Sequence, residues 1–155
     1  MKKQKGFSLI ELLIVVAIIL IIAAIAIPNL LKSRMAANES SAVGSERTLN
    51  TAEVTYSASC PAVGFSASIA ELNSGAACAG GTGIIDNVLS TGQKSGYAFA
   101  YTVAATNGIN TTYTTVATPN KIGTTGQRGF YSDQTGVIRY TLDGSAPTAA
   151  SLALQ

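Results

Sequence analysis

The pattern of apolar and polar residues divides the chain into two parts. Residues 12–27 are all Leu, Ile, Val or Ala, and the wider apolar segment covers residues 7–31. The interruptions within that segment are Ser8, Glu11, Pro28 and Asn29. As a helix, residues 7–31 would be about 38 Å long, enough to cross a hydrocarbon core of ~30 Å with some tilt. The pattern predicts a membrane-spanning helix close to the N-terminus.

The basic residues before the apolar segment predict its orientation. Lys2, Lys3 and Lys5 all precede it. Because lysines hold their end of a membrane helix in the cytoplasm, the remainder of the chain is expected on the far side. The alternative is a secretory signal peptide cleaved after Ala26. Glu11 at the start of the apolar core and Pro28 just after that cut argue against it.

The helical pattern continues beyond Pro28. Residues 32–58 hold no proline and a single glycine, Gly44, and mostly permit a helix. Two sets of residues in this range repeat every seven positions: Glu39, Glu46 and Glu53, and Met35, Ala42, Leu49 and Tyr56. The two sets lie close together on a helical wheel, so the amphipathicity is weak and predicts no coiled coil. One helix over residues 7–58 would be about 78 Å long, and Pro28 is expected to kink it or loosen the turns before it.

The second half of the chain changes period. Residues 59–95 are expected to form a linking region, with helical turns near residues 68–73 and 84–89. Residues 96–144 alternate as strands do, with hairpin turns at Asn107-Gly108 and at residues 134–136. The pattern predicts an α+β fold in which four antiparallel strands pack one face on the long helix. Residues 145–155 are expected to lie on this head as a tail.

Charge and composition exclude several functions. The net charge of +2 includes the leading lysines, and removing residues 1–6 leaves seven basic and eight acidic side chains. No basic field for nucleic acid remains. The absence of histidine from the sequence excludes Ser-His-Asp and Cys-His catalysis. Asp133 and Asp143 are the nearest candidates for a carboxylate pair, but their neighbouring glycines favour a role in turns.

The glycine-containing loops fit no nucleotide or metal motif. Residues 79–83 ("AGGTG") and 92–96 ("GQKSG") lack the order that a phosphate or dinucleotide loop requires. The stretch "DQTGVI" lacks the alternating acidic ligands of a calcium loop. Asn38 and Asn110 begin glycosylation sequons, which are weak patterns. The sequence therefore predicts neither a cofactor nor a metal site.

The two cysteines, Cys60 and Cys78, lie 18 positions apart. If this region is exported, a disulfide between them is expected, and closing a loop of that length would stabilise the fold by roughly 3 kcal/mol on the chain-entropy model. The alternative is two unlinked, buried small residues.

The N-terminus resembles that of type IV pilins and the related pseudopilins. The stretch "KGFSLIELLIVVAIILIIAAIAIPNLL" combines a short basic leader ending in Gly6, an aromatic Phe7, Glu11, a long apolar helix and Pro28. The resemblance covers about the first 35 residues closely and the remainder only in layout. It implies the same long helix and antiparallel sheet.

The resemblance also implies roles for individual residues. Prepilin peptidase would cut between Gly6 and Phe7 and methylate the new amine of Phe7. In such families the residue at the position of Glu11 meets the amino terminus of a neighbouring subunit during assembly. Glu11 could instead reach the amine of its own chain or lie at the lipid interface. The proline implies local melting of about residues 20–28 in a filament, although Leu20 stands where many relatives have glycine.

The predicted function is that of a structural filament subunit and not of an enzyme. The regions are a leader (residues 1–6), a membrane and filament-core helix (7–31), a head-packing helix (32–58), a linking loop (59–95), a sheet (96–144) and a tail (145–155). The subunit would leave the inner membrane through pilus assembly machinery and form an extracellular homo-oligomeric filament. The alternatives are a pseudopilin of a type II secretion system and a secreted, cysteine-bridged binding module.

Overall fold

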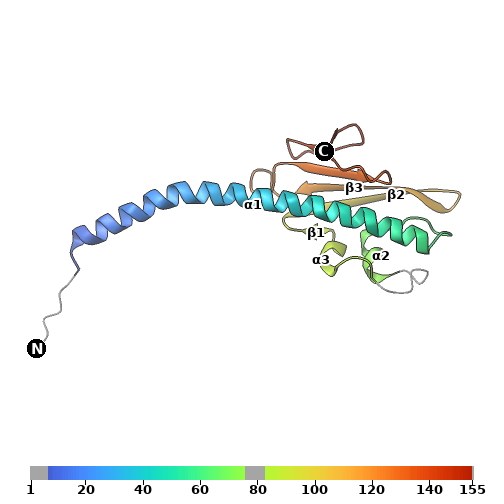
Figure 1. Cartoon of the computed structure of the whole chain (residues 1–155), viewed down its shortest axis with the longest axis horizontal. Helices are drawn as coiled ribbons and strands as arrows, with labels where there is room; N and C mark the ends of the chain where they lie inside the picture. The colour runs from blue at the N-terminus through green and yellow to red at the C-terminus, as the bar shows by residue number, and fades with distance from the viewer. Residues whose placement is uncertain (1–6, 76–82, 155) are drawn as a thin grey trace, which may run out of the picture. The chain divides into compact units, whose positions relative to one another are not determined.

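The computed structural model describes residues 7–75 and 83–154 (Figure 1). These residues form two compact units, one ending at Arg34 and one beginning at Met35. The first unit is helical. The second, the head, contains the end of the same helix, two short helices and a sheet.

The long helix α1 spans Leu9–Ser59, close to the predicted residues 7–58. Ser8 precedes it, and the first backbone bond runs from the Leu12 N–H to the Ser8 carbonyl. Cys60 still donates its N–H to the Tyr56 carbonyl, and Pro61 follows. Proline is common just after a helix end because it cannot continue the helical hydrogen bonds. The helix continues without interruption through Pro28.

The prediction of an antiparallel sheet is confirmed, but the prediction of four strands is wrong. The sheet has six strands in the order β1-β2-β3-β4-β5-β6, and every neighbouring pair is antiparallel. The strands are β1 (Gln93–Lys94), β2 (Tyr97–Thr106), β3 (Ile109–Pro119), β4 (Gly129–Asp133), β5 (Arg139–Thr141) and β6 (Leu152–Ala153). The strand β6 falls in the predicted tail, and β1 falls in the predicted linking region.

The central hairpin is formed by β2 and β3 around Asn107 and Gly108. Both residues have positive φ, 54° and 82°, as a two-residue type I′ turn requires. The pairing starts at Thr106 with Ile109 and extends to Tyr97 with Pro119, with one irregularity after Ala104. The turn thereby fixes which residues of both strands face α1.

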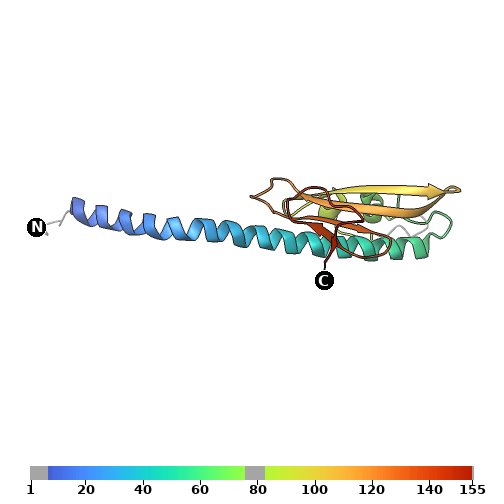
Figure 2. The ribbon, with the colours of Figure 1, turned by 90° about the horizontal axis from the view of Figure 1, so that it is seen from above.

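The core of the head lies between α1 and the inner face of the sheet. It draws Ala42, Leu49, Ala52 and Tyr56 from α1 and Tyr97, Phe99, Ala117 and Phe130 from the strands. The predicted strand alternation is therefore confirmed for Tyr97 and Phe99. Figure 2 shows the end of α1 running along the strands of the head.

Two short helices close the side of the head. α2 (Ile69–Ser74) and α3 (Asn87–Ser90) fall near the predicted helical turns and bury Leu72 and Leu89 in the same core. Ser68 caps α2 by accepting the N–H of Glu71, and Asp86 caps α3 by accepting the N–H of Leu89. Caps of this kind satisfy donors that a helix start leaves free.

Candidate functional site

The N-terminal unit presents an unbroken apolar surface. Every large apolar side chain from Phe7 to Leu31 is exposed, from 84% at Phe7 to 39% at Leu31. α1 contains a stretch long and apolar enough to cross a membrane, with a mean hydropathy of 3.3 and none of that stretch buried. Exposed apolar area on this scale marks a surface that contacts lipid or other apolar helices.

Glu11 is the single acidic residue on that apolar surface. Its Oε2 accepts a hydrogen bond of 2.9 Å from the backbone N–H of Ser8, three residues earlier. Ser-x-x-Glu at a helix start is the sequence of a capping box, in which the glutamate satisfies the N–H of the cap residue. The backbone contact was not among the predicted roles of Glu11, although the Ser-x-x-Glu spacing in the sequence signals it.

Of the two residues at the proposed cleavage site, the structure describes Phe7 alone. Phe7 lies before the helix with its side chain in the open, whereas Gly6 lies outside the described residues. Cleavage between the two residues and methylation of Phe7 therefore stay predictions.

Pro28 occupies the helix without ending it. Nearby, the Ser33 hydroxyl donates to the Asn29 carbonyl at 3.0 Å. This side-chain contact adds to the backbone hydrogen bonds of the helix. The predicted melting of residues 20–28 concerns the assembled filament and stays a prediction.

The predicted disulfide is likewise described at one end. Cys60 is buried at the end of α1, in the head core. Cys78 lies outside the described residues, so the pairing stays a prediction.

Three buried glutamates near the end of α1 connect this helix to other segments of the head by hydrogen bonds. Glu39 is 7% exposed, and Glu46 and Glu53 are 0% exposed. We call them the buried glutamate row. Their heptad spacing is visible in the sequence, but their burial is not, because glutamate is almost never fully buried unless it is paired.

Both carboxylate oxygens of Glu39 and both of Glu53 accept a hydrogen bond. Glu39 accepts the backbone N–H groups of Gln127 and Arg128 and forms a 2.7 Å ion pair with Arg128 Nε. Glu53 accepts the Ser66 N–H at 3.0 Å with one oxygen and the Ser66 hydroxyl at 2.6 Å with the other. These bonds offset the cost of removing two carboxylates from water.

Glu46 differs from its two neighbours in the row. Its Oε2 accepts the Thr115 hydroxyl, and its Oε1 has no hydrogen-bond partner among the described residues. Burial raises the pKa of Glu46 to about 7, and the Thr115 hydrogen bond opposes that rise only in part.

The remaining candidates are structural. Asp133 and Asp143 accept backbone N–H groups two residues ahead, from Thr135 at 2.9 Å and Ser145 at 3.1 Å, so the turn interpretation is confirmed for both. No group of three or more His, Cys, Asp or Glu side chains suited to a metal occurs in residues 7–75 and 83–154.

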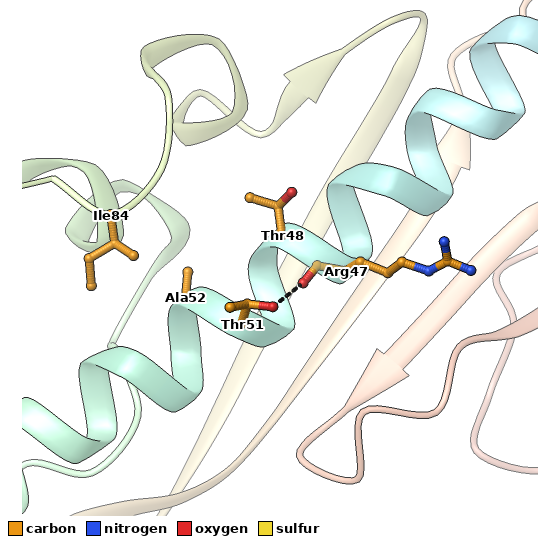
Figure 3. Close-up of a pocket in the computed structure, with 5 residues that line it drawn as sticks. All are labelled: Arg47, Thr48, Thr51, Ala52 and Ile84. Carbon is orange, nitrogen blue, oxygen red and sulfur yellow. Dashed lines mark hydrogen bonds between the residues drawn. The ribbon is translucent and has the colours of Figure 1, made fainter.

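A hollow of about 300 Å³ lies beside α1 and is lined by Arg47, Thr48, Thr51, Ala52 and Ile84 (Figure 3). The one charged residue of this hollow, Arg47, extends away from Ile84. The Thr51 hydroxyl donates a hydrogen bond of 3.0 Å to the Arg47 carbonyl. Specific ligand sites bring several polar groups together, and the five residues that line this hollow do not.

The geometry thus defines a class of protein: a small α+β head carried on a helix whose N-terminal part is suited to a membrane. Residues 1–27 match the family described as the prokaryotic N-terminal methylation motif.

Two curated relatives match a part of the chain. One is the type IV wide pilus major component PilA4 of Thermus thermophilus, 64% identical over 39 residues, which are 25% of this chain and 30% of that protein. Another is the type IV major pilin protein PilA of Myxococcus xanthus, 48% identical over 54 residues, which are 35% of this chain and 24% of that protein. No solved structure matches the chain significantly.

These matches support a type IV pilin, a structural protein and not an enzyme. The matched stretches span less than a third of either relative.

Proposed function

We propose that this chain is a structural subunit of a type IV pilus. The precursor is held in the inner membrane by residues 7–31, with the head on the far side. Prepilin peptidase cuts between Gly6 and Phe7 and methylates Phe7, and assembly machinery then moves the subunit into a helical filament. Adhesion, motility and DNA uptake are the roles open to such a filament.

The observation that carries this proposal is the exposed apolar surface of residues 9–31 with a single carboxylate at its start. In a filament, apolar helices of neighbouring subunits cover that surface. A lone ionised carboxylate entering such a core costs several kcal/mol unless a cation meets it. Cleavage after Gly6 creates a cation at the same depth, the Phe7 amine, so we propose that Glu11 pairs with the Phe7 amine of a neighbouring subunit.

The Ser8 contact makes a sharp test possible, because Glu11 has two separable roles. Glu11→Gln removes the charge but keeps an oxygen that can accept the Ser8 N–H, since glutamine also serves in a capping box. Glu11→Ala removes both. Each variant is expressed as the full precursor in a piliated host that lacks its own major pilin, and sheared filaments are counted by electron microscopy.

We expect both variants to insert in the membrane and both to lose most filaments. Wild-type piliation by Glu11→Gln, with loss in Glu11→Ala, would assign Glu11 to helix capping and overturn the pairing. The mature wild-type subunit is expected to start at Phe7 and to carry one added methyl group in its intact mass.

The same imaging separates the alternatives. Long extracellular fibres support a pilin. Periplasmic material alone, with a secretion defect on deletion, supports a pseudopilin of a type II secretion system, and a mature chain that starts at Ile27 supports a secreted module.

A further inference from the structure

Glu46 is a fully buried carboxyl group in the joint between α1 and the sheet. Its Oε2 meets the hydroxyl of Thr115 in β3, and that hydroxyl also lies 3.5 Å from the Ser132 carbonyl of β4. The other oxygen, Oε1, is buried and has no partner among the described residues. An ionised carboxylate has about four acceptor sites, so most of the acceptor capacity of Glu46 is unused.

The strand register places the charged groups Asp133 and Arg139 on the sheet face opposite to that of Thr115. Thr115 is opposite Ser132, whereas Asp133 is opposite Thr114 and Arg139 is opposite Tyr131. Because successive strand residues point to opposite faces, Asp133 and Arg139 point away from α1.

Among the residues that the structure describes, the titratable groups on the same face as Thr115 offer Glu46 no free cation. By the same alternation they are Tyr97 and Tyr101 from β2, Tyr113 from β3, Tyr140 from β5 and Lys94 from β1. Lys94 is paired with Asp86 at 2.9 Å, and Arg128, before β4, is paired with Glu39 at 2.7 Å. On α1 itself the charged neighbours are Glu39 and Glu53 of the row and the exposed Arg47.

We propose that Glu46 is a proton-binding site that holds α1 to the sheet when it is protonated and weakens that joint when it ionises. A protonated carboxyl group has a donor as well as acceptors, and it buries no charge. An ionised Glu46 would leave an unpaired anion at 0% exposure. The head would then be a pH-sensitive part of the subunit, separate from the N-terminal pairing.

The direction of the effect follows from the two states. Burial raises the pKa of Glu46 from 4.5 to about 7 in the folded head. The folded chain therefore holds a proton that the unfolded chain releases between these values. The resulting stabilisation is fully present below about pH 4.5 and is lost as the pH rises through about 7, and the folding equilibrium constant falls by about tenfold per pH unit within that window.

The test uses the full chain in detergent micelles, with denaturant unfolding of the head followed from about pH 5 to about pH 8. Glu46→Gln is a neutral variant of nearly the same shape. The ratio of its folding constant to that of the wild type should rise by about 100-fold from the acid to the alkaline end. The matched control is Glu53→Gln, from the same row, which should shift the whole curve but keep the wild-type pH dependence. Parallel curves for the wild type and Glu46→Gln would overturn the proposal.

Infrared spectroscopy of the folded wild-type chain gives an answer even if a variant fails to fold. We expect a carbonyl band of a protonated carboxyl group that disappears with a midpoint near pH 7. A midpoint near the ordinary glutamate value, about 4.3, would overturn the proposal.

Discussion

Arg128 Nε lies 2.7 Å from Glu39 Oε2, and this ion pair joins α1 to the segment immediately before β4. The other oxygen of Glu39 accepts the backbone N–H groups of Gln127 and Arg128. The guanidinium of Arg128 also lies 5.6 Å from the ring centre of Phe130. One carboxylate therefore fixes both the backbone and the side chain at the entry to β4.

Replacing Glu39 should destabilise the head more than replacing its partner. We expect Glu39→Ala to lower the free energy of unfolding by about 2–4 kcal/mol, because two backbone donors and a cation lose their acceptor. Arg128→Ala should cost about 1–2 kcal/mol, since the carboxylate keeps its two N–H donors. Denaturant unfolding of the full chain measures the free energy of unfolding of both variants. A larger loss of that free energy for Arg128→Ala than for Glu39→Ala would contradict this account.

Gly64 is expected to tolerate no side chain. Its φ is +83°, and a Cβ there would lie 2.2 Å from the Asn110 carbonyl oxygen, where Gly64 bridges to β3. Gly108 is a matched control, because its φ is +82° but a Cβ would meet nothing within 4 Å. Gly108→Ala should cost about 1 kcal/mol from backbone strain alone, and Gly64→Ala should cost clearly more in the same unfolding assay. Equal losses of unfolding free energy for the two variants would contradict this prediction, because they would show that the backbone near Asn110 can move away from the new Cβ without cost.

Neither sequon asparagine should carry a glycan in the folded head. Asn38 Nδ2 donates to the Thr125 carbonyl and Asn110 Nδ2 donates to the Phe65 carbonyl, each at 2.8 Å, and both contacts are partly buried. A glycan would replace one of the two hydrogens on that nitrogen and would have to fit beside a partly buried contact. The intact mass of the mature subunit should contain no N-linked sugar, and peptide mapping of a sugar to Asn38 or Asn110 would refute this prediction.

The Cys60–Cys78 disulfide should be detectable by alkylation. Without reductant, the denatured full chain should take up no alkylating reagent, and after reduction it should take up two equivalents. Reduction should lower the free energy of unfolding by roughly 3 kcal/mol on the chain-entropy model. Full alkylation before reduction would show that the two cysteines are unlinked.

Much of the fold follows from local sequence signals. Asn107-Gly108 supplies the positive φ values of a hairpin turn, and the alternation of Tyr97 and Phe99 places them in the core. The long helix is predictable because residues 7–58 contain one proline and few glycines, and it ends within one residue of the expected position.

The two missed strands have different causes. β1 turns into β2 through Ser95 and Gly96, whose φ values are 50° and 74°, so a Ser-Gly turn signal was present but not used. β6 has only two residues and is paired with β5. Its residues are both exposed and show no period, so the pairing depends on tertiary contacts that a local pattern does not contain.

The buried glutamate row was the least predictable feature. A repeat of seven places Glu39, Glu46 and Glu53 on one side of a helix, but charged side chains ordinarily mark the solvent side. Their burial depends on Arg128, Ser66 and Thr115, which lie 13 to 89 residues away in the sequence. The Glu11 candidate was found from the sequence because an isolated acid in an apolar run is conspicuous without any tertiary information.

The most direct test of the proposed assembly is electron cryo-microscopy of purified filaments at a resolution that shows side chains. We expect the mature subunit to begin at Phe7 and its amine to lie within hydrogen-bond reach, about 3 Å, of the Glu11 carboxylate of a neighbouring subunit. A mature chain with another first residue, or a Phe7 amine well beyond ~6 Å from every neighbouring Glu11, would contradict the proposal.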